Sequence, residues 1–324
     1  MREDSFFAGK QILVTGGGGY LASGLIPLLQ DSGGRIVRLF RTAPEPGGGA
    51  NSVQDRAVWG DIRDPEIWER VLEGVDVLFH FAAQTSTYEA NADPIADQAV
   101  NVMPMLHLLE ACRRQRRVLK VCFASTVTVA GTPESLPVDE SFPDHPLTVY
   151  DLHKQLAEQY LRWYSEQGWV QGVTLRLANI YGPGPRSSRS DRGILNQMIR
   201  RALAGAPLTV YGTGAQLRDY LFIKDAARAF MAAAAKSESL SGQHFVIGSE
   251  VGHSIAAALQ LVADRASARI GKPVEVRSVV PPAELSPIEQ RSFVADSRRF
   301  REATGWQPQV SLAEGIDQTM EESS

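Results

Sequence analysis

A run of glycines between a strand-like and a helix-like segment constrains the fold of this chain more than any other feature. Residues 10–15 (KQILVT) are typical of a short buried strand, and residues 20–30 have the apolar spacing of a helix. In TGGGGYLASG, Gly16 and Gly19 permit a tight turn and a close approach to a pyrophosphate, which the start of the helix would bind. Ala22 is small enough for close packing of helix on strand. A glycine-rich connection without a ligand is the alternative, which this position disfavours.

Segments of strand length alternate with segments of helical spacing over the first half of the chain. This alternation predicts an α/β fold with a doubly wound parallel sheet, a Rossmann fold. Pro104 should kink or break the longest helix. We expect a dinucleotide-binding domain over residues 1–177 and a smaller, partly interleaved substrate-binding lobe over residues 178–324. Strands are expected over residues 10–15, 35–40, 75–81, 119–124 and 172–177, helices over 20–30, 65–72, 94–113 and 150–166, and a surface loop over 42–52.

Composition excludes several classes of protein. The 324 residues are 44% hydrophobic and 22% charged, which is ordinary for a globular chain. A net charge of −4 provides no basic surface for nucleic acid or anionic lipid. No stretch approaches the roughly 20 apolar residues of a membrane span, and no targeting segment is evident, so we expect a cytoplasmic protein. Cys112 and Cys122 have no metal-ligand spacing, so we expect reduced structural thiols and no metal site.

Polar and small residues follow two of the expected strands and a further short strand before Asp61. Asp61, in GDIRD, is placed to accept a hydrogen bond from an adenine amine or to cap the helix that starts at Pro65. Residues 80–83 (HFAA) lie at the end of the strand expected over residues 75–81, where ligands bind in open α/β sheets, and their alanines leave room for a cofactor. Ser125 and Thr126 follow the strand KVCFA. A hydroxyl there is able to bridge a substrate oxygen and a catalytic phenol, although an ordinary serine/threonine turn is the alternative.

Tyr150 and Lys154 lie four residues apart in the helical segment TVYDLHKQLAEQYL. Residues at i and i+4 share a helix face, so the ammonium group is placed to hold the phenol near its anionic form. Such a phenol is an acid/base at neutral pH, which predicts redox chemistry on a carbon that bears a hydroxyl. A surface helix pair is the alternative for these two residues taken alone.

Eight motifs occur in a characteristic order, and together they resemble the extended short-chain dehydrogenase/reductase family. The closest likeness is to its NAD-dependent epimerase/dehydratase group, which acts on nucleotide sugars. The resemblance implies that Tyr150 and Lys154 are catalytic and that Thr126 completes the triad, with Ser125 as the neighbouring candidate. The motifs are TGGGGYLASG, GDIRD, HFAA, FASTVTVAG, YDLHK, LRLANIYGPG, RDYLFIKD and ATGWQPQVSLAEGI.

The resemblance implies a bound NAD, with NADP as an open alternative. NAD-specific folds usually place a carboxylate at the end of the second strand, but this chain has Phe40 there, followed by Arg41, with Arg38 nearby. Either an arginine accepts a 2′-phosphate, or both arginines are solvated and Asp61 holds the adenosine. The expected cofactor-binding residues are Gly16, Gly19, Tyr20, Leu21, Phe40, Arg41, Asp61, Ile62, Phe81, Ala82, Ala83, Tyr150 and Lys154.

The resemblance also implies a nucleoside-diphosphate sugar as substrate. Asn179 and Arg218 match positions that contact the diphosphate, and an arginine fork suits phosphate geometry. Arg291 is a second candidate for a phosphate ligand, with a solvated surface arginine as the alternative. Tyr211 is placed to line the nucleotide pocket or to serve packing alone. Thr126 would contact the reacting end of the substrate.

Departures from the family pattern narrow the chemistry. Val127 and Thr128 stand where sugar-nucleotide 4,6-dehydratases carry an Asp-Glu pair, and the glutamate of decarboxylating members is missing too. An epimerase of the 4-epimerase kind remains, with a nucleotide-sugar ketoreductase as the first alternative and a non-catalytic dinucleotide-binding protein as the second. A steroid or flavonoid-like ketone is a less favoured substrate. Ala130 and His153 are further departures that reshape the pocket. Relatives pair two helices across a dimer contact, so we expect a homodimer through residues 94–113 and 150–166.

Overall fold

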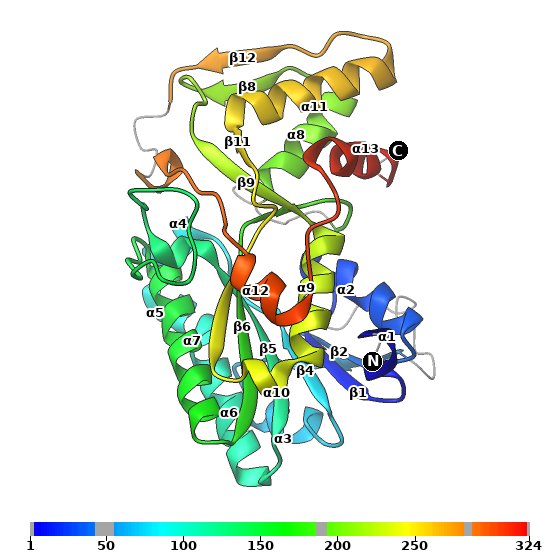
Figure 1. The fold of residues 1–324 in the computed structure, drawn as a ribbon, viewed down its shortest axis with the longest axis vertical. Helices are drawn as coiled ribbons and strands as arrows, with labels where there is room; N and C mark the ends of the chain where they lie inside the picture. Colours follow the sequence, from blue (N-terminus) through cyan, green and yellow to red (C-terminus); the bar gives the residue numbers. More distant parts are fainter. Residues whose placement is uncertain (1–2, 43–54, 186–192, 282–286, 323–324) are drawn as a thin grey trace.

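Seven parallel strands form the central sheet, in the spatial order β10-β6-β5-β4-β1-β2-β3 (Figure 1). The order reverses beside β1, as in a doubly wound Rossmann fold, so the predicted fold class is confirmed. The structure is a computed structural model that describes residues 3–42, 55–185, 193–281 and 287–322. The expected loop over residues 42–52 lies outside the described residues, apart from Thr42. The strands are β1 (Gln11–Thr15), β2 (Arg35–Phe40), β3 (Asp55–Trp59), β4 (Val77–His80), β5 (Leu119–Thr126), β6 (Val170–Leu177) and β10 (Gln243–Ile247).

Helices cover both faces of this sheet. In β1, Ile12 and Val14 belong to the core on one face, whereas Leu13 belongs to the core on the other. Burial on both faces explains why the strands are continuous apolar runs. The first face is covered by α1 (Glu3–Phe7), α2 (Tyr20–Asp31), α9 (Ile223–Ala235), α10 (Ser237–Leu240) and α12 (Arg298–Thr304), and the second by α3 (Pro65–Val71), α6 (Met103–Gln115) and α7 (Val149–Glu166).

The long helix expected over residues 94–113 is broken where the sequence predicted a break. Helix α5 (Pro94–Asn101) ends before Val102, and α6 begins at Met103 with Pro104 in its first turn. Proline lacks an N–H group, and its absence costs least in the first turn of a helix. The short helix α4 (Thr87–Ala92) precedes α5 and, like α5, packs against α7.

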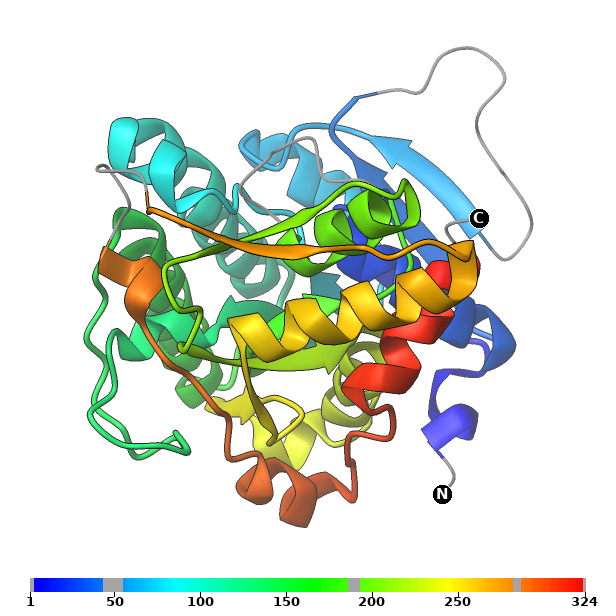
Figure 2. The same ribbon diagram turned by 90° about the horizontal axis from the view of Figure 1, so that it is seen from above.

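A smaller lobe lies beyond the carboxyl end of β6, which leads through Ala178 directly into its first strand. Figure 2 looks down on this lobe and shows α11 and β12 running side by side across it. Strand β10 and helix α9 come from the same half of the chain but pack in the larger part, so the proposed division at residue 177 stays a prediction. The lobe contains the sheet β11-β9-β7, the pair β12-β8 and three helices: β7 (Asn179–Tyr181), β8 (Leu208–Tyr211), β9 (Leu217–Phe222), β11 (Gly252–Ser254), β12 (Val276–Val279), α8 (Ile194–Leu203), α11 (Ile255–Ile270) and α13 (Leu312–Glu322).

Two 3-10 helices complete the described elements, η1 (Val127–Ala130) directly after β5 and η2 (Pro287–Gln290). None of the helices in the described ranges is both long enough and apolar enough to cross a membrane. Both cysteines are buried and reduced, as the sequence predicted: Cys112 lies in α6 and Cys122 in β5.

Candidate active site

The glycine turn after β1 is packed so closely that side chains have no room in it. Gly16 has a φ of +67°, and a Cβ atom on it would lie 3.0 Å from the backbone nitrogen of Ala82. A Cβ atom on Gly17 would lie 2.6 Å from the Cβ atom of Arg38, and one on Gly19 would lie 2.9 Å from the carbonyl oxygen of Gly16. The turn therefore brings bare backbone to the ends of β1 and β4, where the strand order reverses.

Helix α2 presents its N-terminus at this turn without a side-chain cap. Gly19 is the N-cap residue, and this N-cap position makes no side-chain hydrogen bond to the first turn of the helix. Free N–H groups and the helix dipole favour an anion at such an end. This arrangement fits the pyrophosphate of a dinucleotide. The Tyr20 hydroxyl points elsewhere, because it donates to the Gly182 carbonyl (2.7 Å) and accepts from the Asn196 amide (2.8 Å), which ties α2 to the smaller lobe.

The hydroxyl of Thr15 joins the ends of β1 and β4 at the reversal point. It accepts hydrogen bonds from the backbone nitrogens of Phe81 and Ala82, each at 3.1 Å. Its hydrogen is then directed to Nδ1 of His80, 2.9 Å away. Burial lowers the pKa of His80 to about 3, and the charge of Lys154 adds to this effect, so the imidazole is neutral. The predicted residues Phe81, Ala82 and Ala83 follow directly and are partly buried.

The end of β2 lies beside the glycine turn, but its arginines differ in their surroundings. Arg38 is held by Asp55 of β3, with Nε–Oδ1 and Nη2–Oδ2 distances of 2.8 Å. The interpretation of Arg38 as solvated is therefore wrong. Arg41 is exposed. The ring of Phe40 lies next to Gly18, where an added Cβ atom would approach it to 3.1 Å.

Asp61 lies between β3 and α3, and its carboxylate pairs with an arginine instead of capping the helix. The Arg63 guanidinium donates to both of its carboxylate oxygens, at 3.0 and 2.5 Å, which lowers the pKa of Asp61. The N-cap of α3 is Asp64, so the alternative that assigned this role to Asp61 is wrong. The carbonyl of Ile62 accepts from the Trp68 indole (2.9 Å). Leu21 is partly buried and packs against the core that α2 and α9 share.

Tyr150 and Lys154 are both buried on the face of α7 that packs against the sheet, so the alternative of a surface helix pair is wrong. Tyr150 is 8% exposed and Lys154 is 3% exposed. The ammonium group of Lys154 lies 4.2 Å from the centre of the Phe123 ring in β5. Burial lowers the pKa of Lys154 to about 8, and the charges of Glu158 and Asp97 partly oppose that shift. An ammonium with a pKa near neutrality is typical of a functional site.

Thr126 and Ser125 end β5, and their hydroxyls are committed to different partners. The Ser125 hydroxyl donates to the carboxylate of Glu158. The Thr126 hydroxyl lies 2.9 Å from that of Thr128, which in turn donates to Asp151, the residue after Tyr150. Of the two hydroxyls, that of Thr126 is therefore the one connected, through Thr128, to the first turn of α7.

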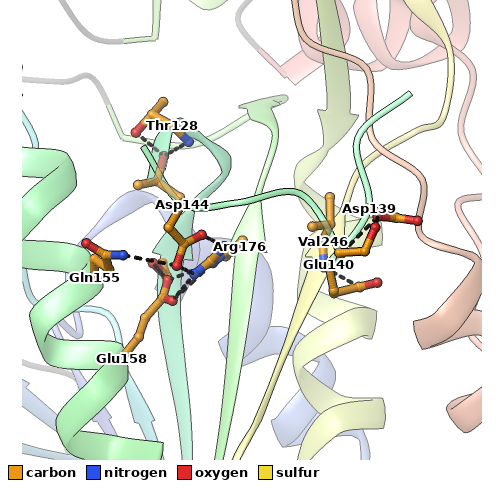
Figure 3. Close-up of polar contacts among 11 residues, drawn as sticks. Thr128, Asp139, Glu140, Asp144, Gln155, Glu158, Arg176 and Val246 are labelled. Atoms are coloured by element: carbon orange, nitrogen blue, oxygen red, sulfur yellow. Dashed lines mark hydrogen bonds and ion pairs between the residues drawn. The ribbon is translucent and has the colours of Figure 1, made fainter. Parts of the chain in front are cut away.

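The Glu158 carboxylate that accepts from Ser125 belongs to a buried ion network, which the sequence did not predict. Arg176 of β6 lies between Glu158 and Asp144, as Figure 3 shows. Its Nη2 atom is 2.6 Å from Glu158 and 2.9 Å from Asp144. Gln155 donates to Asp144 from the outer side (3.1 Å). An arginine within the apolar run GVTLRL was the one signal in the sequence.

A second buried network joins α5 to α7 at His153. Asp97 accepts hydrogen bonds from His153 Nδ1 (2.7 Å), Gln84 Nε2 (2.8 Å) and Asn101 Nδ2 (2.9 Å). All the donors converge on a carboxylate that is almost fully buried. His153, a departure from the family pattern, is thus a partner of Asp97, which also contributes to the charge around Lys154.

Two arginines from the smaller lobe meet beside η2. Arg218 of β9 donates to the carbonyls of Leu217 (3.1 Å), Glu289 (2.7 Å) and Arg291. The Nε and Nη1 atoms of Arg291 are buried and have no partner among the described residues. Burial lowers the pKa of Arg291 to about 10, the charge of Arg218 adds to this effect, and Asp151 opposes it. The solvated-arginine alternative for Arg291 is therefore wrong.

The other two predicted substrate residues occupy different sheets of this lobe. Asn179 is exposed on β7, opposite Tyr220 of β9. Tyr211 ends β8, is about half exposed, and pairs with Val279 of β12. Asn179 thus shares the sheet of Arg218, whereas Tyr211 does not.

Comparisons with known proteins agree with this geometry. The family model described as "NAD dependent epimerase/dehydratase family" matches residues 12–248 of this chain. A UDP-glucose 4-epimerase of Mycolicibacterium smegmatis is 32% identical, over 95% of this chain and 97% of the relative. Among solved structures, a Thermus thermophilus UDP-glucose 4-epimerase in complex with NAD is 30% identical, with a TM-score of 0.81 and coverage of 96% and 98%. A Thermotoga maritima UDP-glucose 4-epimerase with UDP-glucose is 26% identical, with a TM-score of 0.83 and coverage of 97% and 98%.

Proposed function

Because this chain belongs to the NAD-dependent epimerase/dehydratase family, we propose that it is a nucleotide-sugar epimerase that inverts one ring carbon, carbon 4. The observation that carries the proposal is the burial of Tyr150 and Lys154 on one face of α7, beside the end of β5. His80 links them to the glycine turn, because the charge of Lys154 lowers its pKa and its Nδ1 atom is hydrogen-bonded to the Thr15 hydroxyl. An acid/base pair and a dinucleotide cradle thus meet at one edge of the sheet.

Each protein group has a defined task in this reaction. Lys154 holds the Tyr150 phenol near its anionic form, and the phenolate takes the proton of the sugar hydroxyl. Bound NAD would supply the redox step at the carbon that carries this hydroxyl. Thr126 bonds to the same oxygen and fixes its position. The keto sugar then turns over, so that the hydride would return to the opposite face of the carbon, while Tyr150 returns the proton to the oxygen.

The surroundings of Thr126 favour an epimerase over the dehydrating and decarboxylating members of the family. Val127 is apolar and buried, so it supplies no acid. The Thr128 hydroxyl is bound to Thr126 and Asp151. The first alternative, a ketoreductase, would use the same three residues in one direction only and would consume a reduced cofactor.

NAD is the cofactor we propose, rather than NADP. The pyrophosphate would lie on the turn from Gly16 to Gly19, with Asp61 toward the adenine and Ala82 and Ala83 beside the nicotinamide half. The ion pair of Arg38 with Asp55 removes one candidate for binding a 2′-phosphate. Arg41 is the remaining candidate at the end of β2.

For the substrate, we propose a nucleoside-diphosphate sugar whose diphosphate binds Arg218 and Arg291. The open Nε and Nη1 donors of Arg291 support this, since a buried guanidinium without partners is costly until an anion pairs with it. Asn179 lies in the same β-sheet as Arg218 and would contact the diphosphate as well. Tyr211 would line the outer part of the nucleotide pocket.

A homodimer through residues 94–113, which form α5 and most of α6, and residues 150–166 of α7 is part of the proposal. Ile95 on α5 is 81% exposed, and Leu152, Tyr160 and Trp163 on α7 are exposed as well. These helices lie together on one side of the molecule (Figure 1). Apolar side chains on adjacent helices are typical of a surface that a second copy covers.

Two measurements on the purified protein test the function. The nucleotide released on denaturation is identified by mass spectrometry, and UDP-glucose is incubated with the protein while its epimer is followed by chromatography. Near-stoichiometric NAD⁺ and formation of UDP-galactose are expected, and Tyr150→Phe should abolish turnover without unfolding the protein. Bound NADP(H), or net consumption of a reduced cofactor with a keto sugar, would replace the epimerase by the ketoreductase.

A further inference from the structure

The first turn of α2 contacts both parts of the molecule. Tyr20 is the first residue of this helix and follows Gly19, so its backbone lies at the end where the cofactor pyrophosphate would bind. Its ring packs against the hydrophobic core of the smaller lobe. Leu21, the next residue, packs against a core of the central sheet instead. Two neighbouring residues of one turn thus belong to different cores.

Tyr20 forms a closed ring of three hydrogen bonds with Gly182 and Asn196. The Gly182 N–H is a donor only and donates to Oδ1 of Asn196 (3.1 Å), so the amide nitrogen of Asn196 faces the Tyr20 hydroxyl (2.8 Å). The hydroxyl hydrogen then goes to the Gly182 carbonyl (2.7 Å). Burial raises the pKa of Tyr20, so the hydroxyl keeps this hydrogen. Each group in the ring therefore has a fixed role as donor or acceptor.

The backbone that follows β7 fits closely against α2. A Cβ atom on Gly184 would lie 2.8 Å from Cε2 of Tyr20. A Cβ atom on Gly182 would lie 2.6 Å from the Ile223 side chain, and one on Gly24 of α2 would lie 2.7 Å from the same side chain. This packing leaves no free space between α2 and the backbone after β7, so a displacement of one moves the other.

Each side of this contact leads to a proposed binding site. Gly182 directly follows β7, where Asn179 is the residue that we place at the diphosphate. Strand β7 pairs with β9, which carries Arg218. On the other side, the N–H groups of the first turn of α2 would bind the pyrophosphate of the cofactor. Tyr20 therefore lies between the two phosphate sites.

We infer that Tyr20 is a positioning residue that couples the cofactor site to the substrate site, because its hydroxyl holds Gly182 and β7 against the first turn of α2. The inference rests on the proposed function, since it takes a dinucleotide and a nucleoside diphosphate as the two ligands. A ligand that orders one side of the contact spares the other ligand part of that cost. Each ligand then binds more tightly in the presence of the other, and the factor is the same for both.

The release of bound cofactor measures this coupling on the holoenzyme. Protein that carries radiolabelled NAD⁺ is diluted into excess unlabelled NAD⁺, and the loss of label is followed with and without saturating UDP. UDP is the probe because it carries the diphosphate but lacks the sugar that would face the nicotinamide. We expect UDP to slow the release about tenfold, the worth of one hydrogen bond, since most differences in affinity are differences in dissociation rate.

Tyr20→Phe removes only the hydroxyl and should reduce the effect of UDP to within about twofold. Asn196→Ala opens the ring from the other side and should reduce the effect as well. Tyr181→Phe is the matched control, since the Tyr181 hydroxyl also donates to backbone carbonyls, those of Ser311 and Leu312, but within the smaller lobe. It should leave the effect of UDP unchanged. A purely structural role of Tyr20 would change the release rate equally with and without UDP.

Failure of this inference and failure of the proposed function give different results. If wild-type protein binds both ligands but UDP does not slow the release, or slows it equally in Tyr20→Phe, the coupling is wrong while the function stands. If wild-type protein fails to bind the dinucleotide or UDP, as judged by calorimetry, the proposed function falls and this inference falls with it. Should Tyr20→Phe fail to fold, Asn196→Ala takes its place in this comparison.

Discussion

The Lys154 ammonium and the Glu158 carboxylate lie one helical turn apart on the buried face of α7. Glu158 is itself held by Arg176 and by the Ser125 hydroxyl. Burial lowers the pKa of Lys154 to about 8, and Glu158 is the largest influence opposing that shift, followed by Asp97. The charge on the proposed catalytic lysine therefore depends on a network that extends beyond the substrate site.

Turnover should fall as the pH rises through about 8. Below this value Lys154 is charged and stabilises the Tyr150 phenolate, whereas above it the ammonium loses its proton and that support. The groups that face Lys154 are Glu158 and Asp97, which favour its charge, and His80, which is neutral in this range. The measurement is a profile of kcat against pH from 6 to 10.

Glu158→Gln should move this decline to lower pH, because the remaining surroundings disfavour the ammonium even more. Glu166→Gln is the matched control, since Glu166 lies on the same helix but is exposed and paired with Arg162. A wild-type profile that is flat between pH 7 and 10, or an equal shift in both variants, contradicts the role of Lys154.

Lys154→Met should stabilise the protein at neutral pH while it removes activity. The pKa of Lys154 falls from its ordinary 10.5 to about 8 on folding, which corresponds to a cost of about 3 kcal/mol for the charged form. The folded pKa is below the unfolded one, so this cost is complete below pH 8 and disappears as the pH rises to about 10.5. Denaturant unfolding at pH 7 and pH 10 measures it. A gain in stability that does not shrink with pH would contradict this account.

Arg176→Met should destabilise the fold by about 3–5 kcal/mol, because it leaves the buried Glu158 without its cation. Denaturant unfolding at pH 7 is the measurement. Arg162→Met is a suitable control, since Arg162 lies on the same helix as Glu158 but its ion pair with Glu166 is exposed. If both variants unfold at the same denaturant concentration, the network of Figure 3 contributes nothing to stability.

The fold could be predicted from the sequence because its strands are buried on both faces. Strand β2 has the expected bounds, β5 is longer than expected by the two residues Ser125 and Thr126, and Pro104 breaks the helix where it was expected to. These features depend on apolar runs and on single residues that disrupt helices. Both are local properties of the chain.

The support of the site could not be predicted, because its partners are far apart in the sequence. Asp97 and His153 are separated by 56 positions and Arg176 and Asp144 by 32. Many acidic and basic residues would fit such pairs, and only the fold selects among them. The alternative that Arg38 and Arg291 are solvated was wrong for the same reason. The burial of an arginine depends on neighbours from distant segments of the chain.

Arg291→Met should weaken binding of UDP by roughly 10- to 100-fold, the worth of a charge-assisted hydrogen bond to phosphate. Its open Nε and Nη1 donors lie beside Arg218, so removal of Arg291 leaves a single guanidinium for the diphosphate. Isothermal titration with UDP measures the change. Arg298→Met is the matched control, because Arg298 is exposed and paired with Asp296, and its loss should not alter the Kd. If Arg291→Met leaves the Kd unchanged while Arg298→Met raises it, the diphosphate binds elsewhere, outside the pair that Arg218 forms with Arg291.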